Sequence, residues 1–241
     1  MHRPARDYVL SALAVAFVIL TTSLGFWQLR RLAQRRAQNA EVIARLADPP
    51  VPVTQLTHVS AALHYRRVYL AGAYDYEHEI KIADRTRLGS PGINIVTPLR
   101  IPGSDTAVLV NRGWVYAPDG LTANLLRWRE SDPVNATGYA RPLFRAYAGS
   151  PILPGRPDSF RWLDLTALKS RVPYPVYPFV IVLDGSTAAN GNIPPRVPPP
   201  PLDEGPHRSY AIQWFSFAII GVVGMYFFLR VPPAQRSPNE R

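Results

Sequence analysis

Four residues that could take part in ligand binding stand at the start of an apolar stretch near the C-terminal end of the chain. The sequence GPHRSYAIQWF places them within about two helical turns: His207, Tyr210, Gln213 and Trp214. A neutral imidazole in a partly dry, apolar site is a suitable axial ligand for heme iron. Tyr210 and Trp214, four residues apart, share one helix face and could form an aromatic wall for a flat ring. An interfacial histidine beside an aromatic belt explains the same residues, so both interpretations stay open here. A glutamine amide is costly in lipid without a partner, so we expect Gln213 to face protein or ligand.

A second candidate lies in the strand-like run AVLVNRGWV at residues 107–115. Gly113 predicts a β-bulge or the close approach of another group to the backbone. Arg112 and Trp114 share one face of a regular strand. Arg112 could then bind a carboxylate, such as a porphyrin propionate, while Trp114 stacks on the ring. An ordinary bulged strand with a half-buried tryptophan explains the same pattern.

The remaining polar residues form no recognisable catalytic or metal-binding pattern. The five histidines show neither H-x-x-x-H nor H-E-x-x-H spacing, and Glu77-His78-Glu79 falls at an expected turn, where we interpret it as solvated. The chain contains no cysteine, which excludes disulfides and thiolate chemistry. Its net charge of +10 comes without a basic face or nucleic-acid motif. We therefore expect neither an enzyme nor a nucleic-acid-binding protein.

Two long apolar stretches must position these candidate residues. Residues 8–29 and 209–229 carry no charged side chain, and each is long enough to cross a hydrocarbon core of about 30 Å as a helix. We interpret the first as an uncleaved anchor. Arginines after the second stretch favour cytoplasmic termini, whereas arginines directly after the first oppose that orientation. The sequence thus predicts a cytoplasmic N-terminus (1–7), a transmembrane helix (8–29), a periplasmic domain (30–208), a second transmembrane helix (209–229) and a cytoplasmic tail (230–241), in a bacterial inner membrane.

The region between the two apolar stretches alternates apolar and polar residues with the period of strands. Strands are expected around 65–72, where a glycine ends the run, and around 80–84, 93–97, 107–115, 134–140, 160–163 and 179–183. Helices are expected at 30–47, at 121–130 and directly after Asp164, with extended segments at 49–57 and at the proline-rich residues 190–206. The predicted class is α+β: two transmembrane helices flanking a β-rich periplasmic domain, an antiparallel, barrel-like sheet with a few short helices.

Four ordered stretches resemble the surfeit locus protein 1 family of cytochrome c oxidase assembly factors. They are GFWQLRR at the end of the first apolar stretch, YRRVYLAGAYD, LVNRGWV and HRSYAIQWF. The similarity extends from residue 25 to about residue 229, with both apolar stretches in the expected places. The sequence is therefore identified as resembling this family over most of its length.

The resemblance implies a role in the insertion of heme a into the large catalytic subunit of a heme-copper oxidase. That subunit, a heme a synthase and membrane lipid are the implied partners, and the central domain is implied to lie in the periplasm. His207 corresponds to a suspected iron ligand, with heme a as the suspected cofactor. The candidate cofactor-binding set is His207, Tyr210, Trp214, Gln213 and Arg112. In the family an asparagine shortly precedes this histidine, whereas here Glu204-Gly205-Pro206 stands before it.

Two other functions also fit the residues. A heme-free scaffold would hold an oxidase subunit through helix–helix contacts of Gln213, Ser216 and the small residues Gly221 and Gly224. A membrane-anchored enzyme is the third possibility, and the lack of a recognisable nucleophile–base pair counts against it.

Overall fold

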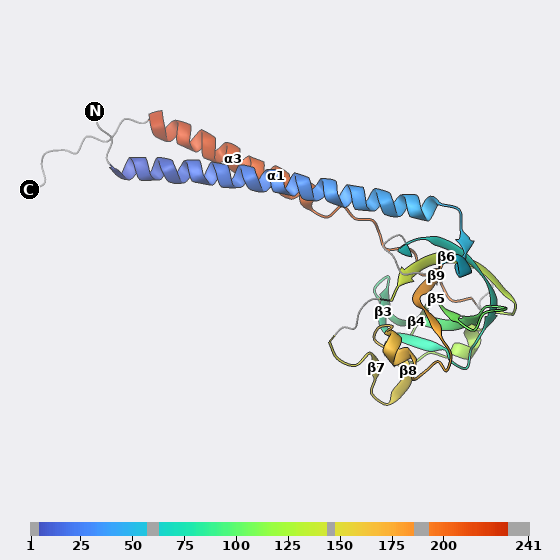
Figure 1. Cartoon of the computed structure of the whole chain (residues 1–241). Coiled ribbons are helices and arrows are strands. Elements are labelled where there is room, and N and C mark those ends of the chain that lie inside the picture. The colour runs from blue at the N-terminus through green and yellow to red at the C-terminus, as the bar shows by residue number, and fades with distance from the viewer. Residues whose placement is uncertain (1–4, 57–62, 144–147, 186–192, 231–241) are drawn as a thin grey trace, which may run out of the picture. The chain divides into compact units, whose positions relative to one another are not determined.

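The computed structural model describes residues 5–56, 63–143, 148–185 and 193–230 (Figure 1). The helices are α1 (Ala5–Ala47), η1 (Val53–Gln55), η3 (Leu125–Trp128), α2 (Leu165–Leu168) and α3 (His207–Arg230). The strands are β1 (Val51–Pro52), β2 (Arg67–Tyr74), β3 (Ile80–Arg87), β4 (Ser90–Arg100), β5 (Ala107–Tyr116), β6 (Val134–Pro142), β7 (Ile152–Leu153), β8 (Arg156–Phe160) and β9 (Val176–Leu183). Two compact units result: a helical unit of Met1–Glu41 with Pro201–Arg241, and a β-rich unit of Val42–Pro200. The predicted cytoplasmic segments fall mostly outside the described residues.

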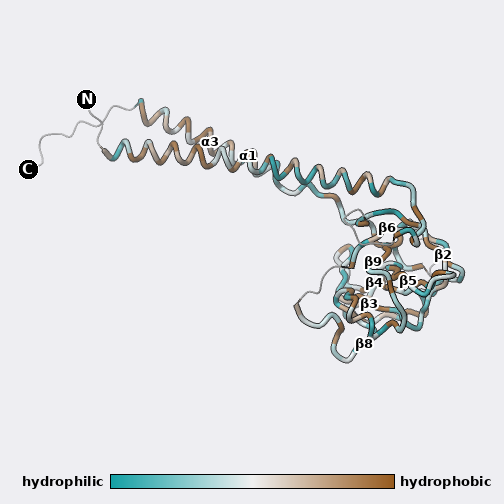
Figure 2. The backbone as a smooth tube through the Cα atoms, viewed as in Figure 1, coloured by the Kyte–Doolittle hydropathy of each residue, from teal (hydrophilic) through white to brown (hydrophobic). Residues whose placement is uncertain are grey.

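The helical unit contains two helices that are long and apolar enough to cross a membrane, which indicates membrane association. Helix α1 has 43 residues and is about 65 Å long at 1.5 Å per residue, twice the thickness of a hydrocarbon core. Figure 2 shows that its first half is apolar and its second half largely polar. The prediction that the first span continues as a helix over residues 30–47 is therefore confirmed.

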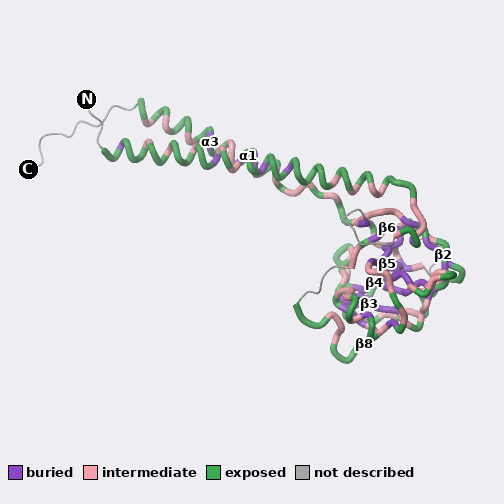
Figure 3. The backbone as a smooth tube through the Cα atoms, in the orientation of Figure 1, coloured by how far each residue is buried: buried purple, intermediate pink, exposed green. Residues whose placement is uncertain are grey.

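Helices α1 and α3 lie side by side and antiparallel (Figure 1). The buried positions of α1 are spaced as one stripe, with Thr21, Gly25 and Gln28 at its centre. The buried residues of α3 are the small Ala211 and Ala218, seven positions apart. Most other positions of both helices are exposed, as Figure 3 shows. Small residues at this seam allow the two backbones to approach closely.

The β-rich unit is built on a five-stranded barrel. The strand order is β2-β6-β9-β5-β4, and a second pairing between β2 and β4 closes the ring, with Ala73 opposite Arg100. Strands β3, β8 and β7 extend the sheet beyond β4, and β1 pairs with β2. Gly72 was expected to end its strand, yet it lies inside β2 at the closure point, where a Cβ atom would overlap the carbonyl oxygen of Arg100.

The predicted class, two long apolar helices flanking a β-rich, barrel-like unit with a few short helices, is confirmed. The sheet is mixed rather than purely antiparallel, which corrects the predicted sheet type. Strands β5 and β9 run parallel, as do β3 and β8, and β1 and β2. Parallel neighbours need long connections, and the connection between β5 and β9 contains β6, β7, β8 and α2. Local alternation in the sequence indicates a strand but does not specify which distant strand will pair with it.

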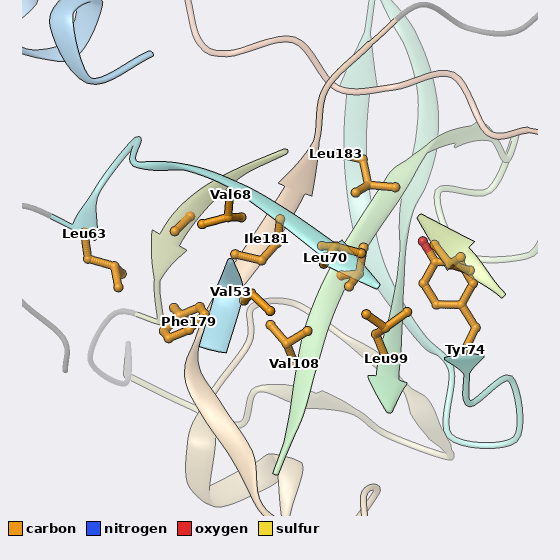
Figure 4. Close-up of a cluster of buried hydrophobic side chains, with 13 residues drawn as sticks. Val53, Leu63, Val68, Leu70, Tyr74, Leu99, Val108, Phe179, Ile181 and Leu183 are labelled. Atoms are coloured by element: carbon orange, nitrogen blue, oxygen red, sulfur yellow. The ribbon is translucent and has the colours of Figure 1, made fainter. Parts of the chain in front are cut away.

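Two apolar clusters flank the barrel wall. The interior cluster contains Leu70, Leu99, Val108 and Ile181 (Figure 4). A second cluster packs Leu109 and other side chains of the wall against α2 and the residues after it. Strand β2 therefore alternates buried and exposed residues, whereas β5 is buried along almost its whole length because both of its faces are covered.

Several local predictions differ from the structure. Residues 121–130 form only the short 3-10 helix η3, and the strand expected at 160–163 is β8, which ends at Phe160. The segment expected to be a linker at 49–57 contains β1 and η1. The short helix after Asp164 is confirmed: the Asp164 carboxylate accepts hydrogen bonds from the backbone N–H groups of Thr166 and Ala167 at the start of α2.

Candidate functional site

His207 is the first residue of α3 and contacts α1 directly. Its Nδ1 atom lies 2.8 Å from Oε1 of Gln28, a residue 179 positions earlier in the chain. An amide oxygen can only accept a hydrogen bond, so the proton of a neutral imidazole resides on Nδ1 in this pair. The other ring nitrogen, Nε2, then keeps its lone pair. A hydrogen bond of this kind is the usual way in which proteins orient a histidine that binds a metal.

Gly205 lies beside the Nε2 edge of the imidazole. Its φ is +72°, a conformation that glycine adopts readily, and a Cβ atom at this position would lie 3.4 Å from both Cδ2 and Nε2 of His207. A Cβ atom here would be in van der Waals contact with the nitrogen that keeps its lone pair. The replacement of the family's asparagine region by Glu204-Gly205-Pro206 is thus compatible with an accessible histidine.

Glu204 itself takes part in a contact within the helical unit. Its carboxylate pairs with the Arg36 guanidinium in a two-pronged ion pair, with distances of 2.9 and 3.0 Å. The hydrogen bond from Arg36 holds the pKa of Glu204 below its usual value. The amide of Asn39 also donates to the carbonyl oxygen of Leu202 at 3.3 Å. These contacts attach the segment before α3 to the polar half of α1.

The other predicted residues of α3 lie beside His207 on the helix surface. A turn of about 100° per residue places Tyr210 and Trp214 close to the direction of His207, while Gln213 lies about a third of a turn away. Tyr210 and Gln213 are exposed and Trp214 is half-buried. Tyr210 and Trp214 therefore lie on the same side of α3 as the histidine. Gln213 is exposed, so its amide is open to an external partner.

The glycine of the G-x-W-Q stretch has a packing role in the same region. A Cβ atom on Gly25 would lie 2.6 Å from a ring carbon of Phe215 on α3. Phe26 also meets Phe215 edge to face, with ring centroids 5.3 Å apart. Gly25 thus lets α3 approach α1, and Gln28, one turn further on, reaches His207. The structure brings two of the four characteristic stretches together at one contact.

Arg112 lies in the β-rich unit, where its guanidinium is fully buried and already paired. Its Nη1 lies 2.8 Å from Oε1 of Glu79, and its Nε lies 3.0 Å from Oε1 of Glu130. Its Nη2 donates to the carbonyl oxygen of Trp128. The rings of Tyr74 and Tyr76 lie 4.9 and 5.1 Å from its guanidinium carbon. Every side of the guanidinium is in contact with protein.

The buried arginine helps to hold the proline-rich segment that leads to α3. Arg196 of that segment pairs with Oε2 of Glu130 at 2.9 Å and donates to the carbonyl oxygen of Arg112. The N–H of Trp114 donates to the carbonyl oxygen of Pro195 at 2.8 Å. Gly113 has φ +148°, and a Cβ atom there would lie 2.5 Å from that same oxygen. The predicted bulge and close backbone approach at this glycine are therefore confirmed.

These contacts correct the interpretation of Arg112 and Trp114 as a shared clamp for a ligand. The register of β4 and β5 shifts at this point, so the two side chains contact different groups. The Trp114 indole N–H donates to the carbonyl oxygen of Arg85 at 2.8 Å, and its ring packs on Gly92. Nothing in this geometry gives Arg112 a position open to a propionate. We therefore leave it out of the proposed ligand site.

Glu79 is a buried partner of Arg112 that the sequence interpretation missed. It was expected in a solvated turn, but its side chain is buried and accepts a 2.6 Å hydrogen bond from Thr97 as well as the Arg112 contact. Burial raises the pKa of Glu79, although Thr97 and Arg112 oppose the shift. The neighbouring His78 pairs with Asp75 at 2.7 Å. The available signal was the position of Glu79, a charged residue directly before the alternating apolar residues of β3. A carboxylate there can be buried with the strand if it has a charged partner.

Gln28 is the second residue whose role was missed. It belongs to a stretch that carries the family resemblance, and an amide inside an apolar helix needs a partner in lipid. That requirement alone could have singled it out. The identity of its partner could not be read from the sequence, because the whole β-rich unit lies between α1 and α3 along the chain.

Comparison with known proteins decides the family. The model of the SURF1 family matches residues 15–219, most of the chain. The chain belongs to the SURF1 family. Its relatives include a SURF1-like protein of Monosiga brevicollis, 24% identical over 91% of this chain and 87% of the relative. Surfeit locus protein 1 of Xenopus tropicalis is 26% identical, with 88% and 73% covered. An uncharacterised SURF1-like protein of Mycobacterium tuberculosis is 28% identical, with 91% and 82% covered.

Members of the SURF1 family are generally known as cytochrome c oxidase assembly factors. The predicted family is thus confirmed, and the family indicates an assembly factor rather than an enzyme. The two apolar helices add membrane association to this assignment.

Proposed function

We propose that this SURF1-family protein assists the assembly of a heme-copper oxidase by delivering or stabilising heme a while it enters the large catalytic subunit. The observation that carries the proposal is the hydrogen bond between His207 Nδ1 and Gln28 Oε1. It fixes the imidazole and leaves Nε2 as the nitrogen that can bind iron. Heme iron accepts an imidazole nitrogen as an axial ligand.

The residues around His207 would each contribute differently to binding heme. Gln28 keeps the imidazole in one tautomer and one orientation. Tyr210 and Trp214 present aromatic surface on the same side of α3, where a flat apolar ring can pack. Gly205 places no side-chain atom beside Nε2. Arg112 takes no part in this site.

We infer that the proposed site lies at the boundary between membrane and water, because His207 begins the apolar helix α3. We infer that the protein lies in a bacterial inner membrane, with the β-rich unit in the periplasm and both chain ends in the cytoplasm. Arginines that follow the second apolar helix support this orientation. The proposed partners are the large catalytic subunit and a heme a synthase, which would receive and supply the cargo.

The proposal is tested by complementation in a bacterium that lacks its own copy of this protein. Membranes from cells producing the parent protein, His207→Ala or the control Ile219→Leu would be compared. Ile219 is exposed on α3 and lies well beyond the histidine. We expect heme a absorbance and oxygen consumption by the oxidase to fall with His207→Ala alone, at equal protein levels. Full oxidase assembly with His207→Ala would refute the role of this residue.

A heme-free scaffold remains a second candidate, because part of α3 is open to a partner helix. A Cβ atom on Gly221 would lie 2.9 Å from Val18 of α1, so that glycine is used within the chain. Gly224 has no atom within 4 Å of its corresponding position, and Gln213 is exposed. Gln213→Leu combined with Gly224→Leu should lower oxidase assembly under the scaffold function. Under heme delivery by His207 alone, the same pair of substitutions should leave assembly unchanged.

A further inference from the structure

A hollow of about 480 Å³ lies on the outer wall of the barrel. Its floor is aliphatic and comes from neighbouring strands: Ile82 of β3, Val96 of β4, and Val180 and Val182 of β9. The segment directly after β8 forms one wall, and the end of β6 forms another. Hollows of this size with an apolar lining are typical of small-molecule sites. This hollow lies within the β-rich unit and shares no residue with the proposed heme site.

The polar part of the lining is basic. Arg85, Arg141 and Arg161 line the hollow, and its described lining includes no acidic side chain. The Arg85 guanidinium donates to the carbonyl oxygen of Arg161 at 2.7 Å, and the Arg161 guanidinium donates to that of Ser150 at 3.2 Å. Backbone carbonyls thus orient two of the guanidinium groups. Among the described residues, neither Arg141 nor Arg161 forms a salt bridge with a carboxylate.

Two amide side chains add directional hydrogen bonding. Asn94 and Asn111 lie on adjacent strands and face the hollow. The Oδ1 atom of Asn111 accepts a hydrogen bond from the N–H of Gly113 at 3.1 Å, which orients its amide nitrogen as a donor to other groups. Trp162 supplies an aromatic wall. Hydrogen-bond donors outnumber acceptors among the side chains of this lining, and all of its charged side chains are positive.

We propose that this hollow binds an amphipathic organic anion, with a carboxylate at the arginines and an apolar body on the aliphatic floor. Guanidinium groups form strong, geometrically specific hydrogen bonds with carboxylates. The aliphatic floor removes the apolar part of the same ligand from water. Two sources provide this chemistry: a fatty acid and the propionates of a porphyrin. The site does not depend on heme binding by His207.

Photolabelling of the full chain in lipid nanodiscs tests the proposal. The probes are a medium-chain fatty acid that carries a diazirine and the matched alcohol, which lacks the carboxylate. We expect the acid to label peptides of β4, β9 or residues 161–163, with the alcohol labelling them at least about tenfold less. Equal labelling by both probes, or labelling confined to α1 and α3, would overturn the proposal.

Variants of the basic rim provide the matched controls. Arg141 and Arg161 are exposed, so their replacement should leave the fold intact. Arg141→Gln with Arg161→Gln should weaken probe binding roughly tenfold or more, the change expected when charge-assisted hydrogen bonds are lost. Arg156→Gln, an exposed arginine outside the hollow, should have no effect. Unchanged binding in the double variant would also overturn the proposal.

Competition distinguishes the two sources of the carboxylate. Dodecanoate and protoporphyrin would each be added against the probe, with dodecanol and protoporphyrin dimethyl ester as uncharged controls. Displacement at a much lower concentration of dodecanoate than of protoporphyrin identifies a fatty-acid site, and displacement at a much lower concentration of protoporphyrin identifies a porphyrin site. Displacement by the uncharged controls as effectively as by the acids would contradict recognition of a carboxylate.

Discussion

Replacing Arg112 by methionine separates its structural role from a role in ligand binding. The substitution removes the guanidinium from a fully buried position and leaves the Glu79 carboxylate with only the Thr97 hydroxyl as a hydrogen-bond donor. Glu130 keeps its ion pair with Arg196. One carboxylate is therefore left buried without a charge partner, which costs about 3–5 kcal/mol of folding free energy.

A loss of this size is readily measured. About 3–5 kcal/mol corresponds to a fall of roughly 6–20 °C in the melting temperature of a domain of 150–250 residues. Thermal unfolding of the detergent-solubilised chain would be followed by near-ultraviolet circular dichroism, beside the control Arg127→Met. Arg127 is exposed on η3, where its guanidinium carbon lies 5.2 Å from the centroid of the Trp128 ring. The control should change stability by no more than about 0.5 kcal/mol.

A second substitution tests the cause of the loss. Adding Glu79→Gln to Arg112→Met removes the stranded charge, so the double variant should be more stable than Arg112→Met alone. Burial already raises the pKa of Glu79, and the loss of Arg112 raises it further. The deficit of Arg112→Met should therefore shrink as the pH falls and Glu79 takes up a proton. Parent-like stability of Arg112→Met, or no recovery in the double variant, would refute the proposed network.

Two further predictions concern the same unit. Gly113→Ala should lower the unfolding free energy by about 2–4 kcal/mol. The causes are backbone strain at φ +148° and a Cβ atom that would push away the carbonyl oxygen of Pro195, which accepts the hydrogen bond from the Trp114 backbone N–H. Denaturant unfolding that matched the parent would contradict this. Burial tends to raise the pKa of Asp75, but hydrogen bonds from Tyr174 and His78 hold it below 3.8. Its contribution to stability should be complete above about pH 4 and lost as the pH falls through the lowered value, so melting temperatures of Asp75→Asn should be flatter than the parent's in this acid range.

The elements of this protein could be predicted well from its sequence, and their arrangement could not. The uncharged stretches and the period-two alternation identify both long helices and most barrel strands, because these signals are local. Residues 121–130 also carry a helical pattern, yet only η3 forms. There Arg112 donates hydrogen bonds to the carbonyl oxygen of Trp128 and to Glu130. These tertiary contacts hold the backbone after η3 in a non-helical conformation, against its local helical preference.

In the candidate site too, residues close together in the sequence could be grouped, whereas contacts between distant residues could not be predicted. His207, Tyr210 and Trp214 could be grouped from their spacing on one helix. The Gln28 contact could not, because Gln28 and His207 are 179 positions apart, with the β-rich unit between them in the sequence. Arg112 was assigned to a ligand because its carboxylate partners lie 33 and 18 positions away and were not visible as partners in the sequence.

The absorption spectrum of the purified protein tests the central proposal most directly. The parent, His207→Ala and Gln28→Leu would be produced in cells that also synthesise heme a, and purified in the same detergent. We predict a Soret band in the parent, its loss in His207→Ala, and a weaker, shifted band in Gln28→Leu, because the imidazole would lose its orienting hydrogen bond. Bound heme with an unchanged spectrum in His207→Ala, or no heme in the parent, would contradict the proposed role of His207 as the ligand.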